Sequence, residues 1–294
     1  MLRIYTRLVQ LTFIYFCCLF LQGCNVINPK EQVPTYIHID TFKFDVNPLK
    51  TDITTSHQIT QVWAYYNNNP IGQFDLPATF PIMTGGDTGT GQLELAPAII
   101  VDGLNNLLGV YPFYQYDTFT FAIQPGKIIN HLPHTSYFSN IKVVKISDFE
   151  GPVNFSKWAG NIPMVRVTDA SMVFEGYGSG SITLNAVGDS SIDSSTVTPF
   201  AIPKGAAAFI EINYKSDVIF YLGLQANLST VISSTPYFLA GISPSDHWQK
   251  FYLNVAEFAG QYQGDSYTLY IKAVLSAGQT HGRLLLDNIQ LITF

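Results

Sequence analysis

The amino-acid sequence predicts an all-β fold with two sandwich-like domains. Apolar residues alternate with polar ones in steps of two along most of the chain, as they do in half-buried strands, and the 3.6-residue period of helices is nearly absent. Aromatic side chains make up 14% of the residues, including 17 Tyr and 21 Phe, and such residues favour strands. A chain of 294 residues is long enough for two domains rather than one.

The start of the chain has the three parts of a secretory signal peptide. Arg3 and Arg7 provide the positive start, residues 8–21 form a largely apolar stretch, and Gly23 supplies a small residue at its end. The apolar stretch is shorter than the roughly 20 residues that a membrane-spanning helix needs. We therefore expect residues 1–23 to be a signal peptide that is removed on export.

All three cysteines lie in this segment or directly after it, at positions 17, 18 and 24. The tetrapeptide LQGC, residues 21–24, resembles a bacterial lipobox, although Gln22 stands where a small or β-branched residue is usual. The resemblance implies cleavage before Cys24, acylation of its thiol and a lipidated tether over residues 24–34. In Gram-negative lipoproteins an aspartate after the cysteine marks inner-membrane retention, so Asn25 implies the outer membrane, with the leaflet left open.

The charge balance argues against nucleic-acid binding. The chain has 15 basic and 21 acidic side chains, and the mature chain, without Arg3 and Arg7, has a net charge of −8. The sequence contains no cluster of Lys or Arg, which is the electrostatic footprint of a nucleic-acid partner. We therefore expect no nucleic acid among the partners of this protein.

The first domain is expected over residues 35–146. Residues 36–44 alternate in one phase and then change phase, as a bulged strand would. A strand at residues 59–66, an asparagine-rich turn and a return strand at residues 71–76 predict a hairpin. Further strands are predicted at residues 91–101, 117–123 and 141–146, the last of which is apolar enough to cross between the domains.

A new series of strand and turn patterns begins at residues 148–158, and the second domain is expected over residues 147–294. Gly, Ser, Pro and Asp residues, which favour turns, separate its strands. One short segment, residues 255–262, has a helical pattern. The predicted strands cover residues 180–187, 207–224, 250–255, 267–275 and 283–292.

The segment VWAYYNNNPIGQFDLPATFPI, residues 62–82, suggests a family for the first domain. An Asn-rich turn followed by a G-x-F-x-L-P return strand resembles the small lipoprotein-borne modules related to PEGA and prealbumin-like sandwiches. The resemblance covers about residues 35–145. It implies a non-catalytic spacer or docking unit.

The second domain opens with DFEG at residues 148–151, followed by Trp158, and closes with LLLDNIQLI at residues 284–292. These features resemble the galactose-binding-like jelly rolls found among carbohydrate-binding modules. The resemblance implies a jelly-roll fold and a structural calcium ion shared by Glu150 and Asp287, whose oxygen ligands suit that ion. The alternative is that Asp287 only hydrogen-bonds the first strand. We expect no other cofactor.

The motifs that suggest catalysis are incomplete. Asp87-Thr88-Gly89 matches the nucleus of aspartic proteases, but that chemistry needs two carboxylates and the chain has one such tripeptide within a glycine-rich loop. His131 and His134 flank Pro133, which breaks any helix that would align them as metal ligands. The chain has no Gly-x-Ser-x-Gly motif. We therefore expect a protein that is not an enzyme.

Four aromatic residues are candidates for ligand binding because each lies beside polar or turn-forming residues: Trp158, Tyr177, Tyr221 and Trp248. Their rings offer rigid platforms on which a sugar can stack. The alternative is that they pack in the core, as large aromatic side chains usually do. Trp63, in the middle of a strand, is expected in the core.

Two functions remain open. The first is a non-catalytic envelope lipoprotein that docks as a scaffold component to an outer-membrane protein or complex. The alternative is a glycan-binding lipoprotein that uses the C-terminal jelly roll. A row of exposed aromatic rings on one sheet face would indicate a sugar, whereas a broad flat apolar patch would indicate a protein partner.

Overall fold

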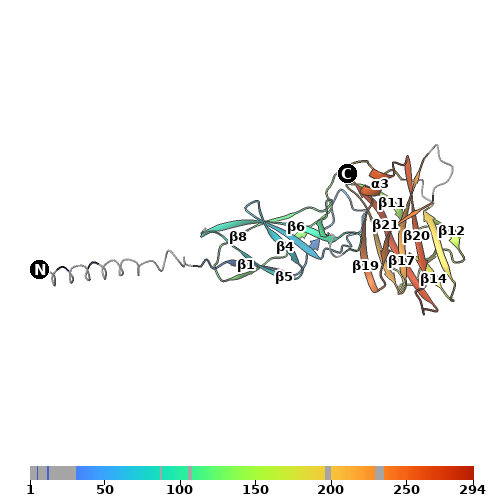
Figure 1. Ribbon diagram of the computed structural model, residues 1–294, viewed down its shortest axis with the longest axis horizontal. Helices are drawn as coiled ribbons and strands as arrows, with labels where there is room; N and C mark the ends of the chain where they lie inside the picture. The colour runs from blue at the N-terminus through green and yellow to red at the C-terminus, as the bar shows by residue number, and fades with distance from the viewer. Residues whose placement is uncertain are drawn as a thin grey trace.

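The computed structural model confirms the all-β fold (Figure 1). It describes residues 31–294 other than 87, 105–107, 196–199 and 229–234, and only Tyr5 and Thr12 before them. The lipidation site at Cys24 and nearly all of the signal peptide therefore lie outside the described residues. Within the described part of the chain, no helix is both long and apolar enough to cross a membrane.

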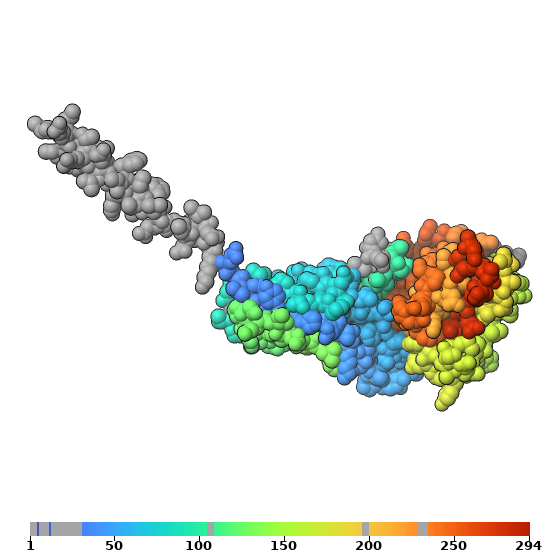
Figure 2. All heavy atoms as spheres, turned by 90° about the horizontal axis from the view of Figure 1, so that it is seen from below, coloured from blue at the N-terminus to red at the C-terminus, as the bar shows by residue number. Residues whose placement is uncertain are grey.

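The molecule is elongated, and two units lie end to end along its long axis (Figures 1 and 2). The first unit, coloured blue to green, contains the N-terminal half of the described chain. The second unit contains the rest and ends near the junction, where Phe294 packs against Phe113 of the first unit with 4.8 Å between ring centroids.

The first unit is a β-sandwich. Its strands are β1 (Thr35–Ile39), β2 (Lys43–Phe44), β3 (Gln61–Tyr66), β4 (Asn69–Asp75), β5 (Ala78–Ile82), β6 (Thr90–Ile100), β7 (Leu108–Val110), β8 (Asp117–Ala122), β9 (Ile128–Asn130) and β10 (His134–Thr135). One sheet has the order β5-β1-β9, and the other has the order β4-β3-β6-β7 with β8 also paired to β6. A two-stranded ladder pairs β10 with β2.

Strands β3 and β4 form the hairpin that the sequence predicts. Tyr66 pairs with Asn69, so the turn consists of Asn67 and Asn68. Both residues have positive φ, 47° and 65°, a conformation that Asn tolerates better than most other residues. The run of asparagines thus selects this turn.

Two local expectations for the first unit are wrong. The phase change within residues 36–44 is a change of sheet rather than a bulge, because β1 pairs with β5 and β9 whereas β2 pairs with β10. Trp63 does not lie in the core. Val62 and Ala64 are fully buried on one face of β3, so the alternation turns Trp63 to the opposite face, where it is partly exposed.

The second unit is a sandwich of two larger sheets. Its elements are β11 (Lys142–Ser147), β12 (Phe155–Gly160), β13 (Val165–Val167), β14 (Ser179–Leu184), β15 (Ser190–Ser195), β16 (Ala208–Ser216), β17 (Ile219–Asn227), β18 (Tyr237–Ile242), β19 (Ser245–Asn254), α3 (Ala256–Gln261), β20 (Ser266–Val274) and β21 (Gly282–Thr293). The six-stranded sheet has the order β13-β14-β21-β16-β19 with β11 also paired to β21. The five-stranded sheet has the order β12-β15-β20-β17-β18.

The core of the second unit lies between these sheets. Ile212 of β16 and Leu222 of β17 belong to one buried cluster, and burial of each such side chain stabilises the fold by about 1.5–3 kcal/mol. The alternate residues of β16, including Glu211 and Asn213, are also buried. They lie on the outer face of the six-stranded sheet, which the first unit partly covers, and they therefore form the floor of the junction.

The chain enters the second sandwich through β11. This strand, which the sequence predicts as the crossing between domains, pairs antiparallel with β21 from Lys142 to Ser147. Ile146 and Ser147 are buried. The crossing segment is therefore part of the second unit's sheet rather than an exposed linker.

Candidate functional site

The outer face of the five-stranded sheet carries exposed aromatic and polar side chains. Leu222 and Leu224 of β17 and Leu269 and Ile271 of β20 are buried in the core, so the residues between them point outward. We call this surface the aromatic face and define it by Trp158, Tyr221, Gln225, Phe238, Tyr270 and Lys272.

Trp158 is the most exposed ring of the aromatic face, and contact with a neighbouring ring fixes its orientation. It lies at a register shift of the edge strand β12, and such bulges re-aim a side chain. Its ring meets Tyr270 edge to face, with 5.5 Å between centroids and an interplanar angle of 87°. The Tyr270 hydroxyl donates to Gln225 Oε1 at 2.5 Å. Trp158 is 50% exposed, whereas Tyr270 is only 4% exposed. The buried Tyr270 ring therefore supports the accessible Trp158 ring.

A second aromatic group lies at the other edge of the same face. Tyr221 of β17 and Phe238 of β18 are in edge-to-face contact, with 6.4 Å between centroids. Lys272 Nζ lies 5.5 Å from the centroid of each ring. Such cation–π contacts stabilise by about 0.5–1 kcal/mol at exposed sites and hold the ammonium group above the sheet.

Polar side chains lie at one end of the aromatic face. Asn227 Nδ2 donates to Thr268 Oγ1 at 3.0 Å and to Ser266 Oγ at 3.3 Å. Amide, hydroxyl and ammonium groups thus lie among the rings. This combination can bind a ligand that has both an apolar face and hydroxyl groups.

The four predicted aromatic residues occupy two different regions. Trp158 and Tyr221 lie on the aromatic face. Tyr177, 81% exposed, lies in the loop before β14, and Trp248 of β19 contacts Phe174 of the same loop at 5.2 Å. Gln225, Phe238, Tyr270 and Lys272 of the same face were not predicted from the sequence. The alternation in β20 carries a signal for Tyr270 and Lys272, because each follows a buried core residue.

The predicted calcium ligands lie around the loop that contains Glu175 and Tyr177. Asp287 is fully buried and accepts hydrogen bonds from Ser179 Oγ at 2.7 Å, from Asn288 N at 2.8 Å and from Glu175 N at 3.4 Å. The backbone nitrogen of Tyr177 donates to Glu150 at 2.9 Å. Burial, with a smaller contribution from the charge of Glu150, raises the pKa of Asp287 to about 6.

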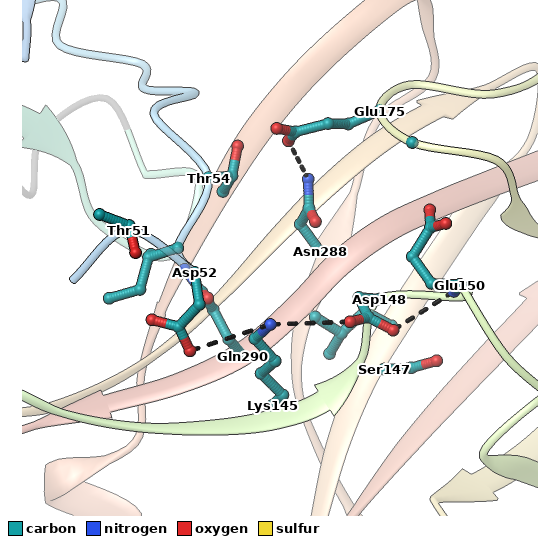
Figure 3. Close-up of a pocket in the computed structure, with 13 residues that line it drawn as sticks. Thr51, Asp52, Thr54, Lys145, Ser147, Asp148, Glu150, Glu175, Asn288 and Gln290 are labelled. Carbon is teal, nitrogen blue, oxygen red and sulfur yellow. Dashed lines mark hydrogen bonds and ion pairs between the residues drawn. The ribbon is translucent and has the colours of Figure 1, made fainter. Parts of the chain in front are cut away.

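Glu150 belongs to an acidic groove between the two units (Figure 3), which we define by Asp52, Lys145, Asp148, Glu150, Glu175 and Asn288. Lys145 Nζ lies 4.0 Å from Asp52 and 3.8 Å from Asp148, and Asn288 Nδ2 donates to Glu175 at 2.9 Å. Carboxylate oxygens suit calcium. The described residues nevertheless contain no group of three His, Cys, Asp or Glu side chains that could hold a metal ion. A cation here would need backbone or water oxygens as well.

His131 and His134 of the first unit each contact a carboxylate. His131 Nε2 lies 2.6 Å from Asp117 Oδ2, and its ring stacks on Phe119 at 3.7 Å. His134 Nδ1 lies 2.6 Å from Asp45. Burial opposes ionisation of Asp117, but the hydrogen bonds from the His131 side chain and the His134 backbone nitrogen lower the pKa of this carboxyl overall. Asp87 of the Asp-Thr-Gly tripeptide lies outside the described residues.

Comparison with known proteins gives likenesses in structure only. No protein-family model matches the sequence, and no curated protein matches it either. The family 11 carbohydrate-binding module of the cellulosomal cellulase Lic26A-Cel5E of Clostridium thermocellum is similar to this chain with 14% identity and a TM-score of 0.36, covering 52% of this chain and 95% of the module.

Two further modules give similar values. The family 30 carbohydrate-binding module of the C. thermocellum cellulase Cel9D-Cel44B has 10% identity and a TM-score of 0.41, covering 51% of this chain and 96% of its own. The family 29 module CBM29_1 of Piromyces equi has 11% identity and a TM-score of 0.35, covering 53% of this chain and 92% of its own. At these values the likenesses say nothing about what this chain binds.

Proposed function

We propose that this protein binds a carbohydrate on the aromatic face of its second unit. The observation that carries the proposal is the arrangement of Trp158, Tyr270, Tyr221, Phe238 and Lys272 on one outer sheet face. The rings stand at both edges of the sheet with polar groups between them. An extended sugar chain has the same alternation of apolar ring faces and hydroxyl groups.

The support for a sugar comes from how the rings are held. Trp158 is half exposed and braced by Tyr270, which Gln225 holds in turn. A ring that is already fixed loses little conformational entropy when a ligand stacks on it. Lys272 Nζ, held between Tyr221 and Phe238, can donate hydrogen bonds to sugar hydroxyl groups.

The composition of the aromatic face favours a sugar over an outer-membrane protein as the partner. A stable protein interface is expected to cover a continuous apolar patch. On the aromatic face, by contrast, Gln225 and Lys272 interrupt the rings, and Asn227 and Thr268 border them. Glycan binding, rather than a scaffold role, is therefore the function we favour.

The remaining parts of the proposal follow from the sequence. We propose that Cys24 is lipidated and holds the protein at the outer membrane, and that the first unit is a non-catalytic PEGA-like or prealbumin-like spacer. We also propose that calcium binds at Glu150 and Asp287, where it would neutralise a buried carboxylate and stabilise the loop before β14. Sugar binding of this kind requires no catalytic group.

A glycan array probed with the full chain tests the proposal. We expect at least one glycan whose binding is weakened in the Trp158→Ala variant and unchanged in the Tyr177→Ala variant, because Tyr177 is exposed away from the aromatic face. A wild-type chain that binds no glycan on a broad array would contradict it.

A further inference from the structure

A second surface with the chemistry of a ligand site lies where the two units meet. We call it the junction groove. The first unit supplies one wall from residues 54–58, and the second supplies Phe174, Glu175, Asn213 and residues 248–250. The groove has a volume of about 430 Å³, enough for one or two sugar rings. It shares no residue with the aromatic face.

One wall of the junction groove is aromatic. The rings of Trp248 and Phe174 lie 5.2 Å apart at 49°, and both are partly exposed. Trp248 comes from β19, and Phe174 comes from the loop before β14, so two separate elements brace the pair. Each ring supports the other as a platform, as Tyr270 supports Trp158 on the aromatic face.

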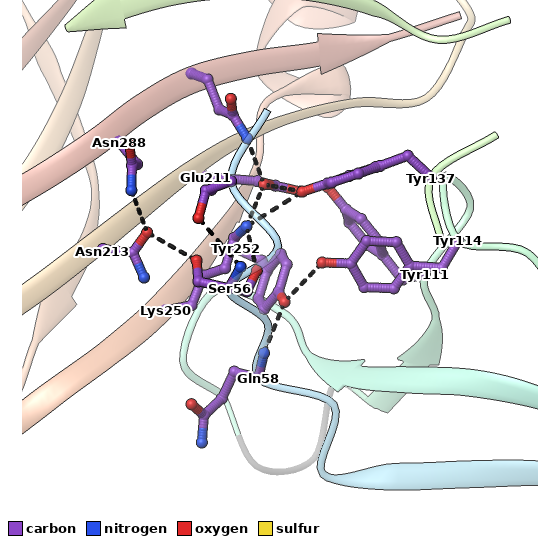
Figure 4. Close-up of polar contacts among 12 residues, drawn as sticks. Ser56, Gln58, Tyr111, Tyr114, Tyr137, Glu211, Asn213, Lys250, Tyr252 and Asn288 are labelled. Carbon is purple, nitrogen blue, oxygen red and sulfur yellow. Dashed lines mark hydrogen bonds and ion pairs between the residues drawn. The ribbon is translucent and has the colours of Figure 1, made fainter. Parts of the chain in front are cut away.

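The side-chain amide of Asn213 at the floor of the groove presents a hydrogen-bond donor to the groove. Asn213 is only 2% exposed, and its Oδ1 accepts from Ser56 Oγ at 2.9 Å and from Asn288 Nδ2 at 3.4 Å. Its own Nδ2 has no hydrogen-bond partner among the residues that the structure describes, and Figure 4 shows the nitrogen outside the dashed contacts. This nitrogen is not among the fully buried polar atoms without a partner, so solvent in the groove reaches it. A ligand hydroxyl group in the groove would accept its hydrogen bond.

The ionisable groups at the floor of the groove carry little net charge. Lys250 Nζ lies 2.6 Å from Glu211, and the side chains are only 1% and 0% exposed, so the ammonium charge is already compensated. Burial, followed by the charge of Lys250, lowers the pKa of His57 to about 4, which leaves the imidazole neutral at pH 7. Glu175, exposed on the rim, accepts a hydrogen bond from the uncharged Asn288 amide and keeps its negative charge. These conditions favour a neutral ligand over an anionic one.

We propose that the junction groove is a second carbohydrate-binding site, built by both units, in which one sugar residue stacks on Trp248 and accepts a hydrogen bond from the Asn213 amide. The site goes beyond the function proposed for the aromatic face and does not depend on it. It would also give the first unit a part in recognition, because Ser56 and His57 belong to that unit.

The experiment uses the full chain carrying Trp158→Ala, which removes the most exposed ring of the aromatic face. The probes are the methyl glycosides of glucose, galactose, mannose and N-acetylglucosamine, and saturation-transfer NMR detects their binding. We expect at least one of them to bind. Adding Trp248→Ala should abolish that binding, and adding Asn213→Asp, which removes the donor while keeping the oxygen that Ser56 and Asn288 contact, should weaken it about tenfold.

Tyr177→Ala in the same background is the matched control, since it removes an exposed ring outside the groove. Thermal unfolding of each variant confirms that it is folded. Failure of every glycoside to bind, or binding that survives both Trp248→Ala and Asn213→Asp, would overturn the proposal. A wild-type chain whose glycan binding depends on Trp158 alone would retain the aromatic face and exclude the groove.

Discussion

Glu211 and Lys250 form an ion pair of 2.6 Å in the junction between the two units, with side chains 0% and 1% exposed (Figure 4). Tyr111 and Tyr137 of the first unit donate their hydroxyl protons to Glu211 at 2.5 and 2.6 Å. Lys250 Nζ donates to the carbonyl oxygen of Ser56 at 2.9 Å. Both charges thus have partners on each side of the junction, and the two units form one polar network.

The tyrosines of this network remain neutral. Burial, and then the charge of Glu211, raises the pKa of Tyr111 and of Tyr137 well above the usual value. The hydroxyl groups therefore act as donors to the carboxylate throughout the physiological range. Tyr111 also packs edge to face on Phe209 at 5.2 Å between centroids, which joins the polar network to the apolar core.

The first prediction concerns this ion pair. Glu211→Gln leaves Lys250 buried without an opposite charge and should lower the free energy of unfolding by about 3–5 kcal/mol. Combining it with Lys250→Met should recover part of the loss. Lys145→Met is the control, because its pairs with Asp52 and Asp148 are exposed and should contribute less than about 1 kcal/mol. Urea unfolding measures all of these, and a Glu211→Gln loss as small as the control's would refute the network.

The second prediction concerns pH. Because burial raises the pKa of Asp287 to about 6, the folded chain binds this proton more tightly than the unfolded chain does. The resulting stabilisation is complete below about pH 4 and is lost as the pH rises through 6, a difference of about 3 kcal/mol. In calcium-free buffer, raising the pH from 4 to 7 should lower the free energy of unfolding of the wild type by about that amount relative to Asp287→Asn. An offset between wild type and variant that stays constant across this range would contradict the assignment.

The third prediction concerns calcium. If the ion binds Glu150 and Asp287, added Ca²⁺ should raise the melting temperature at pH 7, where Asp287 is ionised, and not at pH 4. The gain should reach about 2.7 kcal/mol at a hundredfold excess over Kd. Glu150→Gln should reduce the gain without changing the calcium-free stability much, because Glu150 is exposed. An unchanged melting temperature in millimolar Ca²⁺ at pH 7 would exclude the site.

Local patterns in the sequence were sufficient to predict the fold class and several of its elements. Alternation identified strands such as β17 and β20, and the asparagine run identified the hairpin turn at Asn67 and Asn68. Strands without a clean alternation were not predicted. β18 is an example, because Tyr237, Phe238 and Leu239 are all exposed at the edge of the sheet.

The sites depend on contacts between residues far apart in the chain. Trp158 meets Tyr270 because β15 lies between β12 and β20 in the sheet, and no local pattern encodes that order. Asn213 becomes part of a groove only because residues 54–58 of the first unit approach it. The sequence could therefore indicate Trp158 and Tyr221 as candidates, but it could not place them on one face.

The affinity of the Trp158→Ala variant for a sugar decides whether the aromatic face is a binding site. Using the glycan that the array identifies, isothermal titration should show affinity weakened by about 2 kcal/mol, or roughly 30-fold in Kd. The melting temperature should hardly change, because Trp158 is half exposed. Tyr177→Ala should bind like wild type. Wild-type affinity in both Trp158→Ala and Tyr221→Ala would rule out sugar binding on the aromatic face.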